Sequence, residues 1–582
     1  MQNIIKKPIF KFEQKSSFVK IYLLLLLFAF ALLIRMTGIL WGNIHFDENI
    51  AMSVKVLTGQ LIPDQHYYPP LLNYLNAGAF AIMYGIGRLI GVWKDLAGFR
   101  AQYFENIAPF LFAARLVTAC LGAAAAPISV LIAQRFRLPL LWSFLVGVLI
   151  ALFPVQVLLS HISKSDVGLS TAVLLVVWSL LRKLDLPNSK FADVLLGLSI
   201  ALAFSFKHSA LFVVAPLFFG MIIFMKVNNH VGWKQVIQSS AIVVLSSIVL
   251  WIPLNIGIVL DFQNFLEFQK VQNQMSYRSD GLFQGLGKWL SIQLDIYGGA
   301  TIPALLLWLL VPVIRRDKET LLIWGSTVLG IVIIASITGL RQTPSLWLTY
   351  SMLIIVLAAI AAITLLTRTN QGRQWRYVGA VGLAAMFIWS SVGTINVLKQ
   401  ALSVPVNEQL KKAITELVKP NETRILGASN ISNVLPIDPK AQEDEYQRHE
   451  RLAKKYGVKL PPRATEKIFK DLKSNDGYYI RSFPWAIGGL EVYDEQNTKT
   501  IKPFAWPIQK EEWQLKYWTD QGFEIFIVAD EQLYLQTKVD AYRQFHQQIH
   551  NQCELLKILE PQKPIFWESE LKIYKCNNNN NS

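Results

Sequence analysis

Residues 21–40 read IYLLLLLFAFALLIRMTGIL, an apolar stretch long enough to cross a bilayer as one helix. Lysines crowd the chain before it, at Lys6, Lys7, Lys11, Lys15 and Lys20. A signal peptide is the alternative interpretation, but its apolar core is normally about 7–15 residues long, and no small-residue cleavage site precedes Trp41. The stretch therefore predicts an uncleaved first span with the basic N-terminus, residues 1–20, in the cytoplasm.

Further apolar segments follow along the first two thirds of the chain, at 108–134, 139–160, 167–182, 191–206, 209–225, 236–256, 295–313, 320–338, 345–366 and 378–398. Together with the first span they predict about eleven transmembrane helices within residues 21–399. Of the 582 residues, 53% are hydrophobic and 16% charged, against about 25% charged in soluble domains. This composition excludes a soluble globular enzyme, a disordered chain and a disulfide-stapled scaffold.

The stretch 70–91 decides the topology. It opens with Pro69-Pro70, is interrupted by Asn73 and Asn76, and ends near Arg88. If it lies along the membrane surface, the basic clusters of the later loops fall on the cytoplasmic side, as such clusters normally do; if it crosses, they are inverted. We therefore expect a juxtamembrane helix here, inside a long outer loop (41–107), and an extracytoplasmic C-terminal part.

The formal net charge of +16 at first suggests a nucleic-acid partner. Residues 400–582 hold 25 basic and 25 acidic side chains, so the whole excess lies in residues 1–399. In a membrane-spanning segment an excess of Lys and Arg reports orientation. No nucleic-acid partner is expected.

From about residue 400 the composition becomes polar and mixed. Short apolar runs at 423–426, 478–481, 523–528 and 571–574 predict strands, and 443–456 and 538–550 predict amphipathic helices. We expect a soluble α/β domain over 400–576 and a disordered Asn-rich tail over 577–582. Cys553 and Cys576 are able to pair if this domain is extracytoplasmic, although the sequence does not require it, and the three cysteines offer no metal-binding spacing.

Charged residues at the outer ends of spans are the candidate chemical groups, because ionisable side chains are costly there. The expected topology places on this face Asp47, Glu48, Asp166, Lys207, His208 and Arg341. Carboxylates suit deprotonation of an acceptor hydroxyl, and cations suit stabilisation of a departing phosphate. These types together favour transfer from an anionic lipid carrier.

Each candidate also has a plain structural interpretation. Asp47 and Glu48 fit an ordinary hydrated loop, and Asp166 fits a helix cap. Lys207 is able to reach the interface from a helix end, and Arg341, close to Pro344, fits a helix flank. A histidine in a sequence context such as that of His66 is more often a surface-loop residue than a ligand-binding one.

Two local motifs carry a family resemblance: His45-x-Asp47-Glu48 after the first span, and Tyr68-Pro69-Pro70-Leu71 opening the next helix. Arg115 in the second span, an Asp in an outer turn and a Lys in a later hairpin follow in the same order. Most of the chain resembles the GT-C polyprenyl-phosphate-sugar-dependent glycosyltransferases, in the branch of the protein O-mannosyltransferases and the lipid A aminoarabinose transferases.

The resemblance implies roles for individual positions. Asp47 falls on the candidate catalytic base, with Glu48 beside it, and Asp166 on the acid that shapes the site. The expected donor contacts are Lys207, His208, Arg341, Tyr68 and His66. Tyr68 stands where relatives often have His or Lys, and Arg341-Gln342 replaces their Arg-Tyr pair.

The predicted function is an inverting membrane glycosyltransferase that moves a sugar from a polyprenyl-phosphate donor to a lipid, polysaccharide or protein acceptor. It would act at the extracytoplasmic face of the cell membrane (the inner or plasma membrane), in contact with membrane lipids. No cofactor is required, and a divalent cation is compatible although no dedicated ligand set is present. The alternative is a polytopic lipid or saccharide transporter or flippase with an outer accessory domain; the chain lacks the paired halves typical of transporters.

Overall fold

The computed structural model describes residues 13–41, 48, 50–63, 66–227, 231–276, 281–297, 301–337, 344–367, 372–420, 422–427, 435, 437–456, 477–483, 510–535, 540–561 and 570–576. Two residues singled out above, Asp47 and Arg341, lie outside these ranges, as does the Asn-rich tail. The chain divides into two compact units. The first comprises Met1–Thr37, Thr118–Leu254 and Tyr277–Leu398, and the second Gly38–Val117, Asn255–Ser276 and Lys399–Ser582.

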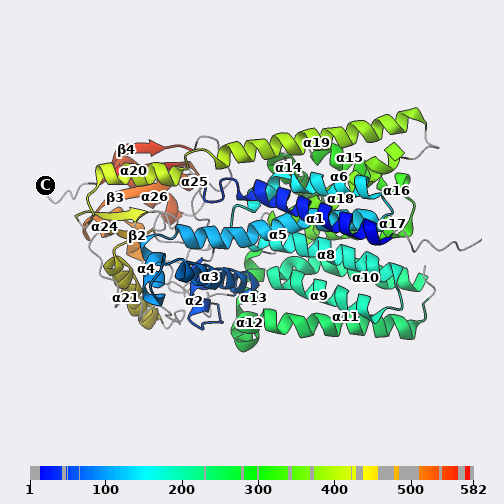
Figure 1. Ribbon diagram of the computed structural model, residues 1–582. Coiled ribbons are helices and arrows are strands. Elements are labelled where there is room, and N and C mark those ends of the chain that lie inside the picture. The colour runs from blue at the N-terminus through cyan, green and yellow to red at the C-terminus, as the bar shows by residue number, and fades with distance from the viewer. Residues whose placement is uncertain are drawn as a thin grey trace, which may run out of the picture. The chain divides into compact units, whose positions relative to one another are not determined.

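The described part of the first unit is entirely helical. Its helices are α1 (Glu13–Met36), α5 (Ala108–Arg135) from Thr118 onward, α6 (Leu140–Ala151), α7 (Pro154–Leu159), α8 (Ser165–Asp185), α9 (Lys190–Phe206), η1 (His208–Ala210), α10 (Leu211–Val227), α11 (Trp233–Leu254), α14 (Leu282–Tyr297), α15 (Thr301–Leu309), α16 (Val311–Ile314), α17 (Lys318–Ile337), α18 (Pro344–Thr367) and α19 (Arg373–Ala401) up to Leu398. The long helices α8, α9, α10 and α11 run side by side (Figure 1).

Eight helical stretches among the described residues are long and apolar enough to cross a membrane. They coincide with eight predicted spans and belong to α1, α5, α8, η1–α10, α11, α17, α18 and the stretch that begins with α19. The three other predicted spans are shorter or interrupted: 139–160 divides into α6 and α7 at Pro154, α9 has 17 residues, and α15–α16 is broken before Pro312. Proline cannot continue a helix without losing a backbone hydrogen bond. The number of crossings stays a prediction.

Helix α18 forms the centre of the bundle. All residues (100%) of its most apolar 18-residue stretch are buried, against 17% of the residues in the corresponding stretch of α11. It packs against α6, α8, α15 and α17. A helix that is apolar all round belongs in such a position, because it has no polar face to offer to water.

The N-terminal part of the second unit is the loop expected outside the membrane. It contains α2 (Ile50–Leu57), α3 (Leu71–Leu89), α4 (Leu96–Glu105) and the first turns of α5, together with α12 (Ile256–Leu260) and α13 (Phe262–Ser276). Phe80, Phe99 and Phe110 form its aromatic core. Helix α3 covers the expected juxtamembrane segment and is not among the eight helices apolar enough to span.

The C-terminal part of the second unit is an α/β domain with a five-stranded sheet of order β2-β1-β3-β5-β4. Its elements are α20 (Val406–Leu417), β1 (Arg424–Gly427), α21 (Pro439–Tyr456), β2 (Tyr479–Ser482), η5 (Lys510–Trp513), α24 (Leu515–Thr519), β3 (Phe523–Ala529), α25 (Glu531–Leu535), α26 (Asp540–Gln552), β4 (Glu554–Leu559) and β5 (Leu571–Lys575). Strands β1, β2 and β3 are parallel, and β5 is antiparallel to both β3 and β4. The latest strand in the chain therefore lies between two earlier ones.

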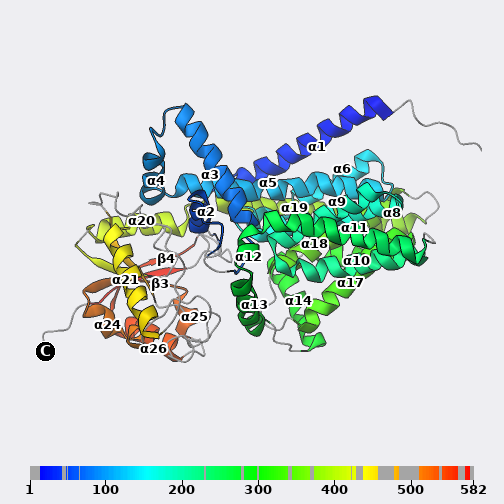
Figure 2. The same ribbon diagram turned by 90° about the horizontal axis from the view of Figure 1, so that it is seen from below.

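Both faces of this sheet are covered, which explains why β3 is apolar without interruption from Ile525 to Ala529. Ile525 and Ile527 point into a core with Leu410 and Ile414 of α20, and Phe526 points to the opposite core with Phe545 of α26. Figure 2 shows α20 and α26 on opposite sides of the strands. The four predicted strands and two predicted helices are all present; α20 and β4 were not predicted.

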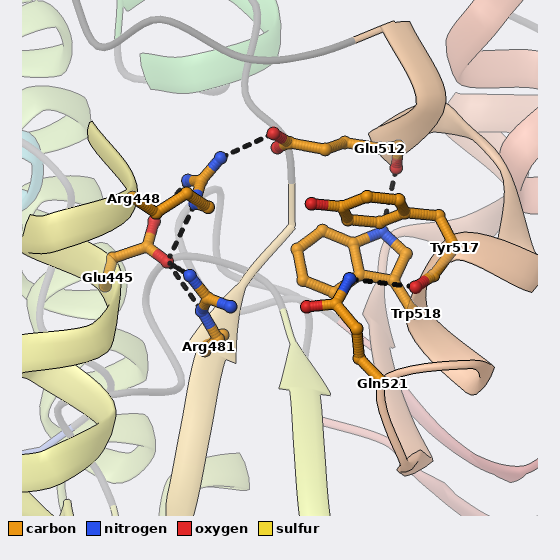
Figure 3. Close-up of polar contacts among 7 residues, drawn as sticks. All are labelled: Glu445, Arg448, Arg481, Glu512, Tyr517, Trp518 and Gln521. Carbon is orange, nitrogen blue, oxygen red and sulfur yellow. Dashed lines mark hydrogen bonds and ion pairs between the residues drawn. The ribbon is translucent and has the colours of Figure 1, made fainter. Parts of the chain in front are cut away.

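Helix α21 is fixed to the sheet by a partly buried ionic network (Figure 3). The Glu445 carboxylate accepts hydrogen bonds from Arg448 and from Arg481 of β2, the latter at 2.6 Å from Nε to Oε2. Arg448 also donates to Glu512 of η5, and Trp518 Nε1 donates to the Glu512 carbonyl oxygen at 2.8 Å. Although burial opposes the charge, the Glu445 and Glu512 carboxylates raise the pKa of Arg448. The network joins α21, β2 and η5.

A disulfide links Cys553, directly after α26, to Cys576, directly after β5. Of the two states that the sequence left open, the structure therefore has the paired one. The bond closes a chain separation of 23 residues around β4 and β5.

Candidate functional site

The loop after the first span is anchored in the second unit by a buried ion pair between Glu48 and Arg115. Arg115 donates from Nε to Glu48 Oε1 and from Nη2 to Oε2, at 2.9 Å each. Its remaining nitrogen, Nη1, donates to the carbonyl oxygens of Ile39 and Trp41 at 3.0 and 2.9 Å. The two charged side chains are at most 1% exposed. One guanidinium therefore holds both the start of the loop and the residue that follows Asp47.

A second charged group lies in the first unit around Asp166, which is fully buried at the first turn of α8. Lys207 Nζ lies 2.8 Å from Asp166 Oδ1, and Lys164 Nζ lies 3.3 Å from Oδ2. The two lysine side chains are 11% and 12% exposed. One buried carboxylate thus gathers two ammonium groups at a partly accessible position.

This geometry bears on the two structural interpretations that the sequence offered for Asp166 and Lys207, a helix cap and a side chain reaching the interface. The N-cap of α8 is Lys164 and no side chain caps the helix, so Asp166 does not act as a cap. Lys207 is the C-cap of α9, and its side chain donates a hydrogen bond to Asp166 instead of extending to the membrane interface. His208 follows directly and begins η1, partly exposed.

The third group of candidate residues precedes α3 in the second unit. His66 is 1% exposed, and its Nε2 lies 2.8 Å from Asp261 Oδ2. Its ring packs edge-to-face against the ring of Phe265. Asn264 donates to Asp261 Oδ1 at 2.6 Å, and Gln269 Nε2 donates to the His66 carbonyl oxygen at 3.3 Å. His66 therefore joins its loop to the α12–α13 segment. Tyr68, two residues on, is partly exposed.

Of the residues singled out from the sequence, the structure brings Asp166 and Lys207 together. Glu48 pairs with Arg115, and His66 pairs with Asp261. Neither Lys164 nor Asp261 was predicted as a site residue. Lys164 had a signal, since it precedes Asp166 by two residues in an outer turn, but nothing in the sequence marks Asp261, which is 195 residues from His66.

Within the described ranges, no three His, Cys, Asp or Glu side chains gather as they would around a metal ion. Asp47 lies outside those ranges. A divalent cation near Asp47 therefore stays a proposal.

No protein-family model matches the chain, and no curated protein sequence matches it. Solved structures do match. The chain is similar to ArnT from Cupriavidus metallidurans in its apo state, with a TM-score of 0.53 and 12% identity over 96% of this chain and 98% of that one. It is also similar to ArnT from the same organism bound to undecaprenyl phosphate, with a TM-score of 0.51 and 13% identity over 94% and 97% of the two chains.

The similarity covers nearly the whole length of both proteins, membrane helices and C-terminal domain included. It confirms the fold predicted from the sequence, a polytopic helical membrane protein with a C-terminal α/β domain, and this fold is shared with ArnT. At 12–13% identity the match concerns the fold.

Proposed function

We propose that this protein is a membrane glycosyltransferase that takes a sugar from a polyprenyl-phosphate donor at the extracytoplasmic face. The observation that carries the proposal is the match along almost the entire chain to ArnT, one of whose structures holds undecaprenyl phosphate. The buried Asp166 with its two lysines supports it, because ammonium groups at a partly accessible position suit a phosphate ligand.

The reaction is a single inverting displacement. The oxygen of an acceptor hydroxyl forms a bond to the anomeric carbon, while the bond from that carbon to the phosphate oxygen breaks. The hydroxyl proton passes to the Asp47 carboxylate, and the leaving polyprenyl phosphate keeps the bonding electron pair. A general base of this kind contributes roughly 10²–10⁴ in rate.

The two carboxylates of the first loop have different tasks in this mechanism. Asp47 is the base. Glu48 has both carboxylate oxygens engaged by Arg115, so it acts by fixing the loop that presents Asp47.

Lys207, with Arg341, stabilises charge on the departing phosphate. Asp166 orients Lys207 and Lys164 by binding both. His208 and Tyr68 contact the donor, and His66 holds the loop of Tyr68 through its bond to Asp261.

The Cys553–Cys576 disulfide supports an extracytoplasmic C-terminal domain, because disulfides persist in oxidising compartments. In the proposed orientation the N-terminus is cytoplasmic, and the protein lies in the cell membrane with its site facing outward. The acceptor is a lipid, polysaccharide or protein of the cell envelope.

The direct test uses the purified protein in nanodiscs with a panel of radiolabelled polyprenyl-phosphate sugars. We expect donor-dependent release of polyprenyl phosphate, reduced at least 10²-fold in Asp47→Asn, in the range of a lost general base. Near-normal release by Asp47→Asn would remove Asp47 from the mechanism. Movement of the intact donor across the bilayer without release would favour the flippase alternative.

The acceptor and the cation need two further measurements. Glycolipids and glycoproteins of cells with and without the gene should differ in one glycoconjugate, which identifies the acceptor. Release of polyprenyl phosphate in the presence of EDTA shows whether a divalent cation takes part.

A further inference from the structure

His161 lies in the turn between α7 and α8 and is 2% exposed. Its Nδ1 lies 2.8 Å from the carbonyl oxygen of Val157, one turn back in α7. Its Nε2 lies 2.9 Å from the carbonyl oxygen of Thr37, directly after α1. All three residues belong to the first unit. Both ring nitrogens therefore face backbone carbonyl oxygens at hydrogen-bonding distance.

This arrangement defines the protonation of the ring. A carbonyl oxygen has no proton and only accepts, whereas a neutral imidazole carries one N–H and one bare lone pair. In either neutral tautomer that lone pair would face an oxygen less than 3 Å away. The imidazolium alone donates from both nitrogens, and hydrogen bonds to the charged form favour it. We propose that His161 is a buried cation at neutral pH and that it positions the end of α1 against the turn carrying Lys164 and Asp166.

The charged groups on the neighbouring described elements act in both directions. Arg35 of α1, Lys164 and Lys207 oppose a further positive charge, while Asp166 favours it. Arg35 donates to the carbonyl oxygens of Ala31 and Ala151 and to Gln156 Oε1. The thiol of α5 is Cys120, and α6 and α7 carry no titratable side chain. Burial of the ring also opposes the charge, because the buried imidazolium loses its hydration. In this proposal the hydrogen bonds to the two carbonyl oxygens, which contact the ring nitrogens directly, outweigh these opposing effects.

The consequence for ligand binding rests on the proposed function. In this region of the described first unit, Arg35, His161, Lys164 and Lys207 carry four positive charges, and Asp166 carries one negative charge. An anionic phosphate complements that excess. The contact of His161 joins the end of α1 to the turn that carries Lys164 and Asp166, so its loss displaces the ammonium groups gathered at Asp166. A displacement of about 1 Å in a group that positions a substrate reduces the rate of reaction by about 10²-fold.

Spectroscopy tests the charge without any activity. The protein contains 8 histidines, and ¹⁵N-histidine labelling in nanodiscs, with His161→Gln to assign its signal, reports the protonation of both ring nitrogens. We expect an imidazolium at pH 7.5. A neutral tautomer of His161 at that pH would overturn the proposal, whatever the activity.

Variants test the positioning role. His161→Phe should expose amides 31–37 to faster hydrogen exchange and reduce polyprenyl-phosphate release about 10²-fold. His161→Lys, which keeps a cation with several donors, should restore both in large part, and Ile162→Val in the same turn should change neither. Equal exchange and release in wild type and a folded His161→Phe would overturn the role. Imidazolium and exchange results as expected, with no release from any donor in the wild type, would uphold the inference and reject the proposed function.

Discussion

Arg115 holds both carboxylate oxygens of Glu48 through two parallel hydrogen bonds of 2.9 Å, at a position where neither side chain is more than 1% exposed. The same guanidinium binds the carbonyl oxygens of Ile39 and Trp41, so one side chain of α5 closes the loop between the end of the first span and α2. A bidentate pair of this kind fixes geometry as well as charge.

Breaking this pair should destabilise the second unit. Glu48→Gln or Arg115→Met alone leaves the partner buried with an uncompensated charge, which costs about 3–5 kcal/mol. The double variant should lose less than the two single losses combined, because neither charge remains. Thermal unfolding of the four proteins in nanodiscs measures the coupling. Strictly additive losses would show that the two residues act independently.

Removing the ammonium of Lys207 should impair transfer, while Lys164, 3.3 Å from Oδ2, continues to compensate the charge of the buried Asp166 carboxylate. Lys207→Met deletes the cation bound to Asp166 at 2.8 Å, and a lost charge-stabilising group typically costs about 10²–10³-fold in kcat. Initial rates of polyprenyl-phosphate release give the value. Arg135→Met is the matched control, because Arg135 forms a half-exposed pair with Asp185 that contributes little. Equal rates for the two variants would exclude Lys207 from the site.

Loss of the Cys553–Cys576 bond should destabilise the C-terminal domain. For the 23-residue separation that it closes, the expected loss is about 3 kcal/mol. Cys553→Ser/Cys576→Ser should show faster hydrogen exchange in β4 and β5, with Cys120→Ser as the control. Mass spectrometry of the unreduced protein checks the bond itself. Full alkylation of both thiols in protein isolated without reductant would contradict the pairing and the extracytoplasmic assignment.

His546 should make the C-terminal domain less stable in mild acid. Burial lowers the pKa of His546 to about 4, with Glu531 acting in the opposite direction, against an ordinary value of about 6.5. Between these values the unfolded chain binds more protons than the folded one, so stability rises with pH. Above about pH 6.5 the histidine is neutral in both states and does not affect the free energy of unfolding. As the pH falls toward 4, that free energy decreases by an amount of the order of 3 kcal/mol.

The measurement is hydrogen exchange of β3 and α26 between pH 4 and 7.5, corrected for the intrinsic rate. His546→Phe, which suits the neighbouring rings of Phe483 and Phe545, should remove most of the pH dependence between about pH 4 and 6.5. An unchanged slope in that variant would assign the effect to other groups, of which Glu531 is the first to examine.

Local patterns were sufficient for most of the fold. Apolar length predicted α1, α5, α8, α11 and α18. The run at 523–528 predicted β3, because burial on both faces leaves most of a strand apolar, here all but Glu524. The breaks in 139–160 and 295–313 were missed because these spans were predicted from the length of the apolar stretch, and that length does not change when a proline interrupts the helix. Strand β4 was missed because Leu555 and Ile558 are about 45% exposed, so its residues do not alternate between core and solvent.

The candidate site was harder to predict, since its contacts join distant residues. Asp166 and Lys207 were both selected, yet their bond spans 41 residues and depends on how α8 packs on α9. Arg115, the partner of Glu48, lies in α5, and Asp261, the partner of His66, lies between α12 and α13, so no local pattern specifies either of them. Tertiary packing alone makes these pairs.

The position of β5 in the sheet has a consequence for biogenesis. Residues 571–575 form the strand between β3 and β4, so the sheet has a gap until the ribosome has made them and they have reached the side of the membrane where the domain folds. Until then β3 and β4 have no partner between them, and Cys553 has no Cys576 to join. Folding of this domain during synthesis therefore stops one strand short, and chaperones that protect unpaired strands have their longest opportunity there.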